Sequence, residues 1–162
     1  MTMMYSPQTP IETILERLDG AFGERTHHYG PVPFDFSDYY SEEMGAELYK
    51  SYYAFSSYID RSRLPAIKNF TNEIEQEFTK DAKRYVNLDP GYITNDKLVL
   101  ATTKDFFHRL YLSEGIYAEV TLHFRKGSFR YFSWTYPDYR HAPLHAFLQK
   151  ARAQLVGDTR KM

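Results

Sequence analysis

Residues 108–136, HRLYLSEGIYAEVTLHFRKGSFRYFSWTY, contain the clearest structural pattern in the chain. Three runs rich in aromatic and β-branched residues are separated by two glycine-containing connections, Ser113–Gly115 and Lys126–Gly127. Runs of this kind, joined by two or three turn residues, are typical of β-hairpins. The pattern therefore predicts two consecutive hairpins of an antiparallel sheet. The expected strands cover residues 108–112, 116–124 and 128–136.

Further strands are expected before this region. KLVLATT, residues 97–103, is a nearly continuous apolar run, which suits a central strand buried on both faces. RYVNL at 84–88 and the aromatic SYYAFSSYI at 51–59 are also predicted strands. At Asp89-Pro90-Gly91, proline precedes glycine as in the central pair of a type II turn. We therefore expect the strand at 84–88 to end in this turn.

The first helix has a clear start signal. Pro10 fits the first helical position, Thr9 is the predicted N-cap, and Glu12 is its capping-box partner. An apolar stripe at helical spacing follows. The stripe consists of Ile11, Ile14, Leu15, Leu18 and Phe22.

Two more helices are expected, one over residues 62–80 and one that starts near Pro143. Glycine and proline in the stretch 23–33 predict a loop there. The stretch 39–49 is ambiguous and is compatible with a short interrupted helix. The sequence thus predicts an α+β fold, with an antiparallel sheet of about five or six strands and helices mostly on one face.

Composition limits the class of protein. A chain of 162 residues suits a single domain spanning 1–162, in which we expect residues 156–162 to form a frayed tail. The net charge of −1 counts against binding to nucleic acid or anionic lipid. The absence of cysteine excludes thiolate catalysis and cysteine-ligated metals. Without a signal peptide or an apolar run of transmembrane length, the chain is predicted to be cytoplasmic, with no membrane partner.

Strand geometry places several polar residues on one face of the predicted sheet. Within 116–124, polar and aromatic residues alternate with apolar ones, so Tyr117, Glu119, Thr121 and His123 share a face. The two hairpin turns then determine which residues lie opposite each other. The predicted cross-strand pairs are Tyr111 with Tyr117, Arg109 with Glu119, Trp134 with Glu119, and His123 with Arg130.

The candidate catalytic residues are Glu119, His108 and Asp105. A carboxylate or an imidazole can act as general base in hydrolysis. Each also has a simpler explanation: Glu119 pairs with Arg109 across the sheet, His108 is a hydrogen-bonded strand residue, and Asp105 is a turn residue.

The candidate ligand-binding residues are basic or aromatic. Lys104, Arg109 and Arg140 would hold an anion through charge-assisted hydrogen bonds. The walls of the pocket would be Tyr117, Trp134 and Tyr136, for which ordinary packing is the simpler alternative.

Metal binding has only weak support in the sequence. A metal-assisted version of the site would use Asp105, His108 and Glu119. His141 and His145 have the spacing of two helical ligands, but Pro143 places His141 at or before the helix start. We therefore assign no metal-binding residues and identify no cofactor.

Several common motifs are absent from the sequence. It has no P-loop, no G-x-G-x-x-G, no G-x-S-x-G and no H-E-x-x-H.

The chain resembles an uncharacterised bacterial family, domain of unknown function 4416. The matching stretches are FDFSDYYSEEMG, IKNFTNEIE, YVNLDPGY, KLVLATTKDFFHRLYL, GIYAEVTL and WTYPDYR, in family order from Phe34 to Arg140. The resemblance implies membership but no particular activity. It also implies an apolar first strand, in place of which this chain has MTMMYSPQTP. Either the sheet has lost that strand, or the chain begins late relative to its relatives. A lost strand would leave an open sheet edge, from which a homodimer could form.

Two functions follow as hypotheses. The first is a site that binds, and in one version hydrolyses, a small anionic, phosphate-bearing ligand. The alternative is a non-catalytic protein-interaction module that uses its aromatic sheet face or open sheet edge. Single-stranded RNA binding by tyrosine stacking is a weaker third hypothesis, because the net charge counts against it.

Overall fold

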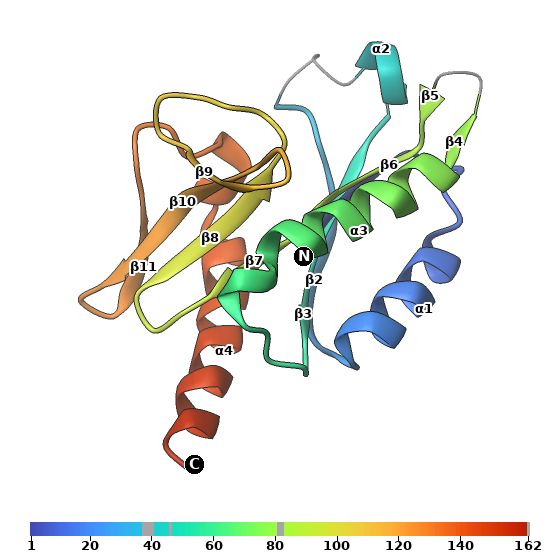
Figure 1. Ribbon diagram of the computed structural model, residues 1–162. Helices are drawn as coiled ribbons and strands as arrows, with labels where there is room; N and C mark the ends of the chain where they lie inside the picture. Colours follow the sequence, from blue (N-terminus) through green and yellow to red (C-terminus); the bar gives the residue numbers. More distant parts are fainter. Residues whose placement is uncertain (37–40, 46, 81–82, 162) are drawn as a thin grey trace.

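The computed structural model describes residues 1–36, 41–45, 47–80 and 83–161. The fold is α+β, as predicted, and its main strands form two antiparallel sheets (Figure 1). A four-stranded sheet has the order β2-β3-β1-β6, and a five-stranded sheet has the order β11-β10-β8-β7, with β9 paired to β10. The sequence led us to expect one sheet, whereas the strands are divided between two.

The first strand is present, so both alternatives for it, loss and a late chain start, were wrong. β1 (Thr2–Tyr5) pairs on one side with β3 (Tyr49–Phe55) and on the other with β6 (Val86–Asp89). All four of its residues are buried. Methionine lacks the β-branching that marks a strand in sequence, and only the neighbours on both sides make this segment a central strand.

The expected loop at 23–33 is instead an edge strand, β2 (Arg25–Pro33), which pairs with β3. The pairing is irregular between Tyr29 and Val32, where Gly30 and Pro31 lie. An edge strand tolerates proline because its outer N–H needs no partner in the sheet. Gly30 has φ +112, and a Cβ there would lie 2.6 Å from the carbonyl oxygen of Lys50.

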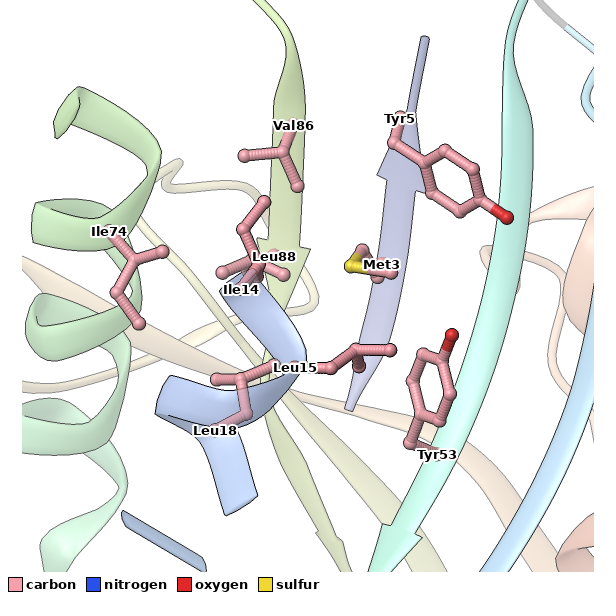
Figure 2. Packing of buried hydrophobic residues seen from close by; sticks show 9 residues of the cluster. All are labelled: Met3, Tyr5, Ile14, Leu15, Leu18, Tyr53, Ile74, Val86 and Leu88. Atoms are coloured by element: carbon pink, nitrogen blue, oxygen red, sulfur yellow. The ribbon is translucent and has the colours of Figure 1, made fainter. Parts of the chain in front are cut away.

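Two helices cover one face of the four-stranded sheet. They are α1 (Ile11–Phe22) and α3 (Leu64–Glu77), the latter within the predicted helix 62–80. Figure 2 shows the core between them and the sheet. Its buried members are Met3, Tyr5, Ile14, Leu15, Leu18, Tyr53, Ile74, Val86 and Leu88. The predicted stripe of the first helix thus faces this core.

The predicted capping box does not form. Pro10 occupies the N-cap position, and no side chain caps the helix. The Thr9 hydroxyl instead donates a hydrogen bond to the carbonyl oxygen of Tyr85, at 2.7 Å. A tertiary contact has therefore replaced the local one.

The five-stranded sheet contains both predicted hairpins. Its strands are β7 (Gly91–Ile93), β8 (Lys97–Thr102), β9 (Leu110–Ser113), β10 (Ile116–Arg125) and β11 (Ser128–Tyr131). Lys126 and Gly127 both have positive φ and form the two-residue turn between β10 and β11. The pairs Tyr111 with Tyr117 and His123 with Arg130 are confirmed.

Three details of this sheet differ from the prediction. The β9–β10 turn is Glu114–Gly115, so Ile116 pairs with Ser113. A register shift between Val120 and Leu122 interrupts the alternation of faces along β10. β11 ends at Tyr131, so Trp134 lies beyond the strand and does not pair with Glu119.

The type II turn expected at Asp89-Pro90-Gly91 does not form. Pro90 connects β6 of one sheet directly to β7 of the other. Gly91 is needed because a Cβ there would lie 2.2 Å from the carbonyl oxygen of Val99. Proline followed by glycine is thus used for a close crossing between the two sheets.

The last helix, α4 (Ala142–Thr159), packs on the side of the four-stranded sheet opposite α1 and α3 (Figure 1). Leu144, Phe147 and Leu148 are buried against residues of both sheets. The helix continues into the tail for which we expected fraying. Among the described residues, no helix is long and apolar enough to cross a membrane.

Short elements complete the description. They are α2 (Ser41–Met44), β4 (Thr79–Lys80), β5 (Lys83–Arg84) and the 3₁₀ helices Arg61–Arg63 and Pro137–Arg140. α2 lies in the ambiguous stretch 39–49, of which residues 39, 40 and 46 lie outside the described part.

Candidate functional site

A polar cavity of about 550 Å³ lies where the two sheets meet. The four-stranded sheet and its connections contribute Phe34, Phe36, Lys50, Arg84, Asn87 and Asp89 to its lining, and α3 contributes Lys68, Asn72 and Glu75. The five-stranded sheet and its loops contribute Leu100 to Lys104, Arg109, Glu119 and Tyr136 to Tyr139. A cavity shared by two structural units is a common place for a small-molecule site.

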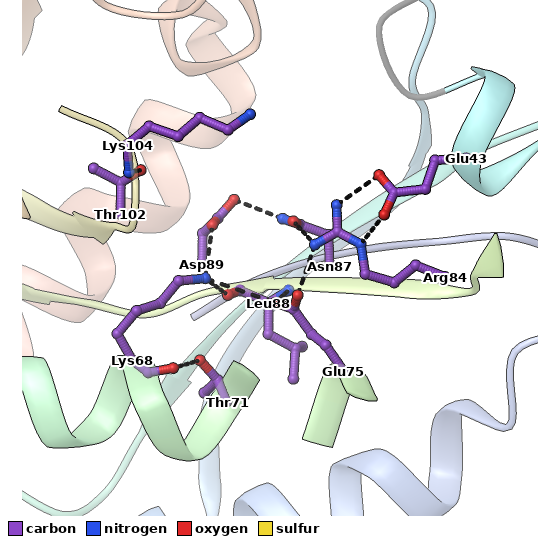
Figure 3. A network of polar contacts seen from close by, with 10 residues as sticks. All are labelled: Glu43, Lys68, Thr71, Glu75, Arg84, Asn87, Leu88, Asp89, Thr102 and Lys104. Atoms are coloured by element: carbon purple, nitrogen blue, oxygen red, sulfur yellow. Dashed lines mark hydrogen bonds and ion pairs between the residues drawn. The ribbon is translucent and has the colours of Figure 1, made fainter. Parts of the chain in front are cut away.

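Lys68 and Glu75 form the α3 side of the cavity (Figure 3). Lys68 Nζ donates to the Leu88 carbonyl oxygen at 2.6 Å, and Glu75 Oε1 accepts from the Leu88 N–H at 2.7 Å. β6 is an edge strand, so these two side chains satisfy backbone groups that would otherwise have no partner in the sheet. Lys68 Nζ also lies 3.4 Å from Asp89 Oδ1.

Arg84 extends this network. Its guanidinium donates to both carboxylate oxygens of Glu43 at 2.9 Å, to Glu75 Oε2 at 2.7 Å and to Asn87 Oδ1 at 3.0 Å. Burial lowers the pKa of Arg84, but the hydrogen bonds to Glu43 and Glu75 outweigh it, and the net shift is upward. For Glu75, burial dominates and raises the pKa, although Lys68, the Leu88 N–H and Arg84 act against it.

A second buried ion pair, between Lys50 and Asp138, also lines the cavity. Lys50 Nζ lies 2.6 Å from Asp138 Oδ2, which also accepts a hydrogen bond from the Tyr52 hydroxyl at 3.0 Å. Lys50 Nζ is 4.5 Å from the centre of the Phe34 ring. Burial raises the pKa of Tyr52, so its phenol stays protonated and donates to Asp138. Asp138 thereby fixes the Lys50 ammonium at the cavity wall.

The third ion pair is the predicted one between Arg109 and Glu119. Arg109 Nε donates to Glu119 Oε2 at 3.0 Å. Its two terminal nitrogens donate to the carbonyl oxygen of Lys104 at 3.1 Å and to the Tyr136 hydroxyl at 3.2 Å. Burial lowers the pKa of Arg109, but the side-chain hydrogen bonds to Glu119 and Tyr136 outweigh this effect. The net shift of its pKa is upward. Arg109, Glu119, Lys104 and Tyr136 all line the cavity.

His108 lies behind this pair. Its Nε2 is 2.9 Å from Glu119 Oε2, and its ring stacks on Trp134 at 5.3 Å between ring centres. A ring that donates Nε2–H to a carboxylate has an unprotonated Nδ1 in its neutral form. That Nδ1 is buried and has no hydrogen-bond partner among the described residues. His108 does not appear in the cavity lining.

The other predicted site residues do not line the cavity. Arg140 donates to the carbonyl oxygens of Thr135 and Ser133, at 2.9 and 3.1 Å. The Tyr117 ring packs edge-on against Tyr111. Packing therefore describes Tyr117, and Arg140 is held by backbone carbonyl groups of its own loop.

Trp134 and Asp105 also lie outside the cavity lining. Trp134 stacks on Phe132 and donates its indole N–H to the carbonyl oxygen of Val120 at 3.1 Å. Asp105 is exposed. Of the three predicted catalytic residues, Glu119 is therefore the one that faces the cavity.

Several cavity residues were not predicted from the sequence. They are Lys50, Lys68, Glu75, Arg84, Asn87 and Asp138. One signal was available for α3: Lys68, Thr71 and Glu75 recur at helical spacing beside the apolar stripe, and all three are buried. Charged residues on a buried helix face indicate a polar partner.

No group of three or more histidine, aspartate or glutamate side chains is placed to hold a metal ion, as far as the described residues go. The spaced pair His141 and His145 belongs to no such group, and His145 Nε2 lies 2.7 Å from the carbonyl oxygen of Tyr139. The metal-assisted version of the site thus gains no support.

Comparison with known proteins gives one match. The model of a family described as a domain of unknown function, DUF4416, matches residues 1–155. The match includes β1, in agreement with the presence of the first strand. No curated protein and no solved structure matches the chain.

Proposed function

The chain belongs to the family of domain of unknown function 4416, and from the cavity we propose that it binds a small anionic, phosphate-bearing ligand. One observation supports this proposal most directly: cationic side chains from β3, α3, β5 and the β8–β9 loop converge on one cavity. They are Lys50, Lys68, Arg84, Lys104 and Arg109. The carboxylates in the same lining are Glu75, Asp89, Glu119 and Asp138.

Apart from the exposed Lys104, these charged side chains are buried or half-buried, and burial of a charge is unfavourable without compensation. Removing an ion from water costs several kcal/mol, and an ion pair often does no more than recover that cost. A fold that needed only stability would gain as much from apolar residues at these positions. Charged groups concentrated around a cavity therefore indicate binding, as perturbed groups in clefts commonly do.

The carboxylate partners orient the cations without using all their donors. A guanidinium has five N–H groups, and Arg109 uses three in its bonds to Glu119, Lys104 and Tyr136. The Lys50 ammonium has three N–H groups, one of which serves Asp138. Lys50 and Arg109 come from opposite sheets, so an anion between them would be held from two sides.

The remaining lining suits the rest of such a ligand. Asn72, Asn87, Thr102 and Thr103 offer amide and hydroxyl groups, and Phe34 and Phe36 offer an apolar surface. A cavity of about 550 Å³ is in the range of small-molecule sites. Phosphate is the favoured anion because it accepts several charge-assisted hydrogen bonds from arginine and lysine together.

In the hydrolytic version of this proposal, Glu119 would be the general base. It lines the cavity, is 3 % exposed, and accepts hydrogen bonds from Arg109 and His108. Asp105 has no part in it, because its side chain is exposed and outside the cavity lining. Binding is the primary proposal, and hydrolysis depends on it.

The test is a thermal-shift screen of the purified protein. The panel contains inorganic phosphate, sugar phosphates and nucleotides, each organic compound beside its dephosphorylated counterpart. A ligand that binds only the folded state raises the melting temperature. We expect a phosphorylated compound to raise it and its counterpart not to.

Two matched variants test whether the thermal shift comes from binding in the cavity. Arg109→Gln combined with Glu119→Gln removes both charges of the pair, so no lone buried charge remains. Arg140→Gln removes an arginine that lies outside the cavity lining. The double variant should lose the shift and Arg140→Gln should keep it. A shift that persists in the double variant, or no shift with any compound, would overturn the proposal.

A further inference from the structure

The most exposed apolar surface lies on and beside β9, away from the cavity lining. Phe107 is 81 % exposed and Leu110 is 71 % exposed. Phe106, Tyr111 and Leu112 are also exposed. We call these five residues the β9 patch. Single exposed apolar side chains are ordinary on a protein surface, but several that adjoin one another commonly mark an interaction site.

β9 is also an open strand edge. It pairs with β10 through Leu110, Tyr111 and Ser113, with a register shift at Leu112, and among the described residues no other strand pairs with it. Native proteins usually protect such edges with charges or proline, or with bulges. Leu110–Ser113 contains neither charge nor proline, so the register shift is its one such feature. The strand is therefore suited to pairing with another strand.

The size of the patch is close to that of an interface. With roughly 150–250 Å² for each large side chain when fully covered, the five residues expose on the order of 500 Å². A standard interface buries about 800 Å² per partner, and the largest patch of a monomer is about 300–600 Å². The patch would therefore supply more than half of the area that each partner contributes to a standard interface.

We propose that β9 pairs antiparallel with β9 of a second copy of this chain, about a two-fold axis. The five-stranded sheets of the two copies would then join into one continuous sheet. A two-fold contact uses the same patch on both subunits, so apolar residues meet apolar residues. The patch is its own best partner because it is apolar on both faces of the strand.

The pairing brings no like charges together. If Tyr111 lies opposite Leu112 of the partner subunit, Leu110 lies opposite Ser113 of the partner subunit, and Leu110–Ser113 contains no charged residue. Like charges facing each other would be destabilising.

This dimer differs from the one expected from the sequence. That expectation depended on the loss of the first strand, and β1 is instead central in its sheet. The β9 pairing uses a different edge in the other sheet. It is also independent of the anion-binding proposal, because none of the five patch residues lines the cavity.

The test is sedimentation velocity of the full chain over a range of concentrations. We expect a dimer for the wild type and a monomer for Leu110→Lys, which places a charge on the strand edge. Phe107→Asp should also give a monomer. The fold should tolerate this change, because the Phe107 side chain is largely exposed in the single chain. Ala153→Lys, an exposed position on α4, is the control and should remain a dimer.

Circular dichroism of each variant shows whether the fold is retained. A wild type that is monomeric at every concentration would overturn the proposal and direct attention to a strand from another protein. A dimer that survives both Leu110→Lys and Phe107→Asp would also overturn it.

Discussion

Lys68 and Glu75 bind the same backbone residue from one side: the Lys68 ammonium donates to the Leu88 carbonyl oxygen, and the Glu75 carboxylate accepts from the Leu88 N–H. The two charged groups lie 3.6 Å apart. Together they close the open edge of β6 and form one wall of the cavity. The same side chains thus serve the fold and the candidate site.

Replacing Lys68 should be costly. Lys68→Met leaves the Leu88 carbonyl oxygen unpaired and Glu75 with one cation fewer, and breaking a buried pair costs about 3–5 kcal/mol. The control variant is Lys97→Met, which removes a partly exposed lysine paired with Asp96. Exposed pairs contribute about 0–1 kcal/mol. Urea denaturation of both variants measures the difference, and equal losses would contradict the edge-closing role.

Glu75 should make stability depend on pH. Burial raises its pKa above the ordinary value of 4.5, so the folded state binds more protons than the unfolded state at pH values just above 4.5. The free energy of unfolding contributed by this group therefore falls as pH rises from about 4.5 through the folded pKa. The glutamine of Glu75→Gln cannot titrate. The free energy of unfolding of the wild type minus that of the variant should therefore fall over the same pH range. A constant difference would show that the pKa of Glu75 is not raised.

The crossing between the sheets gives a prediction about Gly91. A methyl group there would meet the backbone of Val99, which cannot move aside easily. Gly91→Ala should therefore destabilise the protein by about 1–3 kcal/mol, as overpacking does. Gly157→Ala in α4 meets nothing within 4 Å and should stabilise the helix by about 0.5–1 kcal/mol. Thermal unfolding of the two variants should show shifts of opposite sign.

The geometry of Arg109 should matter as well as its charge. Arg109→Lys keeps a cation but cannot donate at once to Glu119, the Lys104 carbonyl oxygen and Tyr136. We expect weaker binding of any phosphorylated compound, by about tenfold or more, which corresponds to about 1.4 kcal/mol. Titration calorimetry of the compound that gives the largest thermal shift measures the change. Unchanged affinity would show that Arg109 does not contribute to ligand binding.

Local patterns predicted the parts of the fold that depend on local chemistry. Lys126–Gly127 formed the expected turn, because both residues take the left-handed conformation that a two-residue hairpin needs. The cross-strand pair Arg109 and Glu119 followed from the register of that region. Pro90 and Gly91 were misinterpreted, because a tight turn and a close crossing between sheets use the same two residues.

The rest of the site depends on contacts between distant parts of the chain. Lys50 and Asp138 are 88 residues apart in sequence, and no spacing rule links them. β1 was missed for a similar reason, because its burial comes from β3 and β6 on either side. The buried charges on α3 were the one site signal that helical periodicity contained and that we did not use.

The most direct test of the account is whether an anion binds between the two sheets. Titration calorimetry would compare the wild type with a Lys50→Met, Asp138→Asn double variant, using the phosphorylated compound that gives the largest thermal shift. The double variant removes the ion pair that joins β3 to the segment after β11 and leaves Arg109 and Glu119 in place. We predict that binding is lost while the circular dichroism spectrum is unchanged. Equal affinity for both proteins, or no binding by the wild type, would contradict the account.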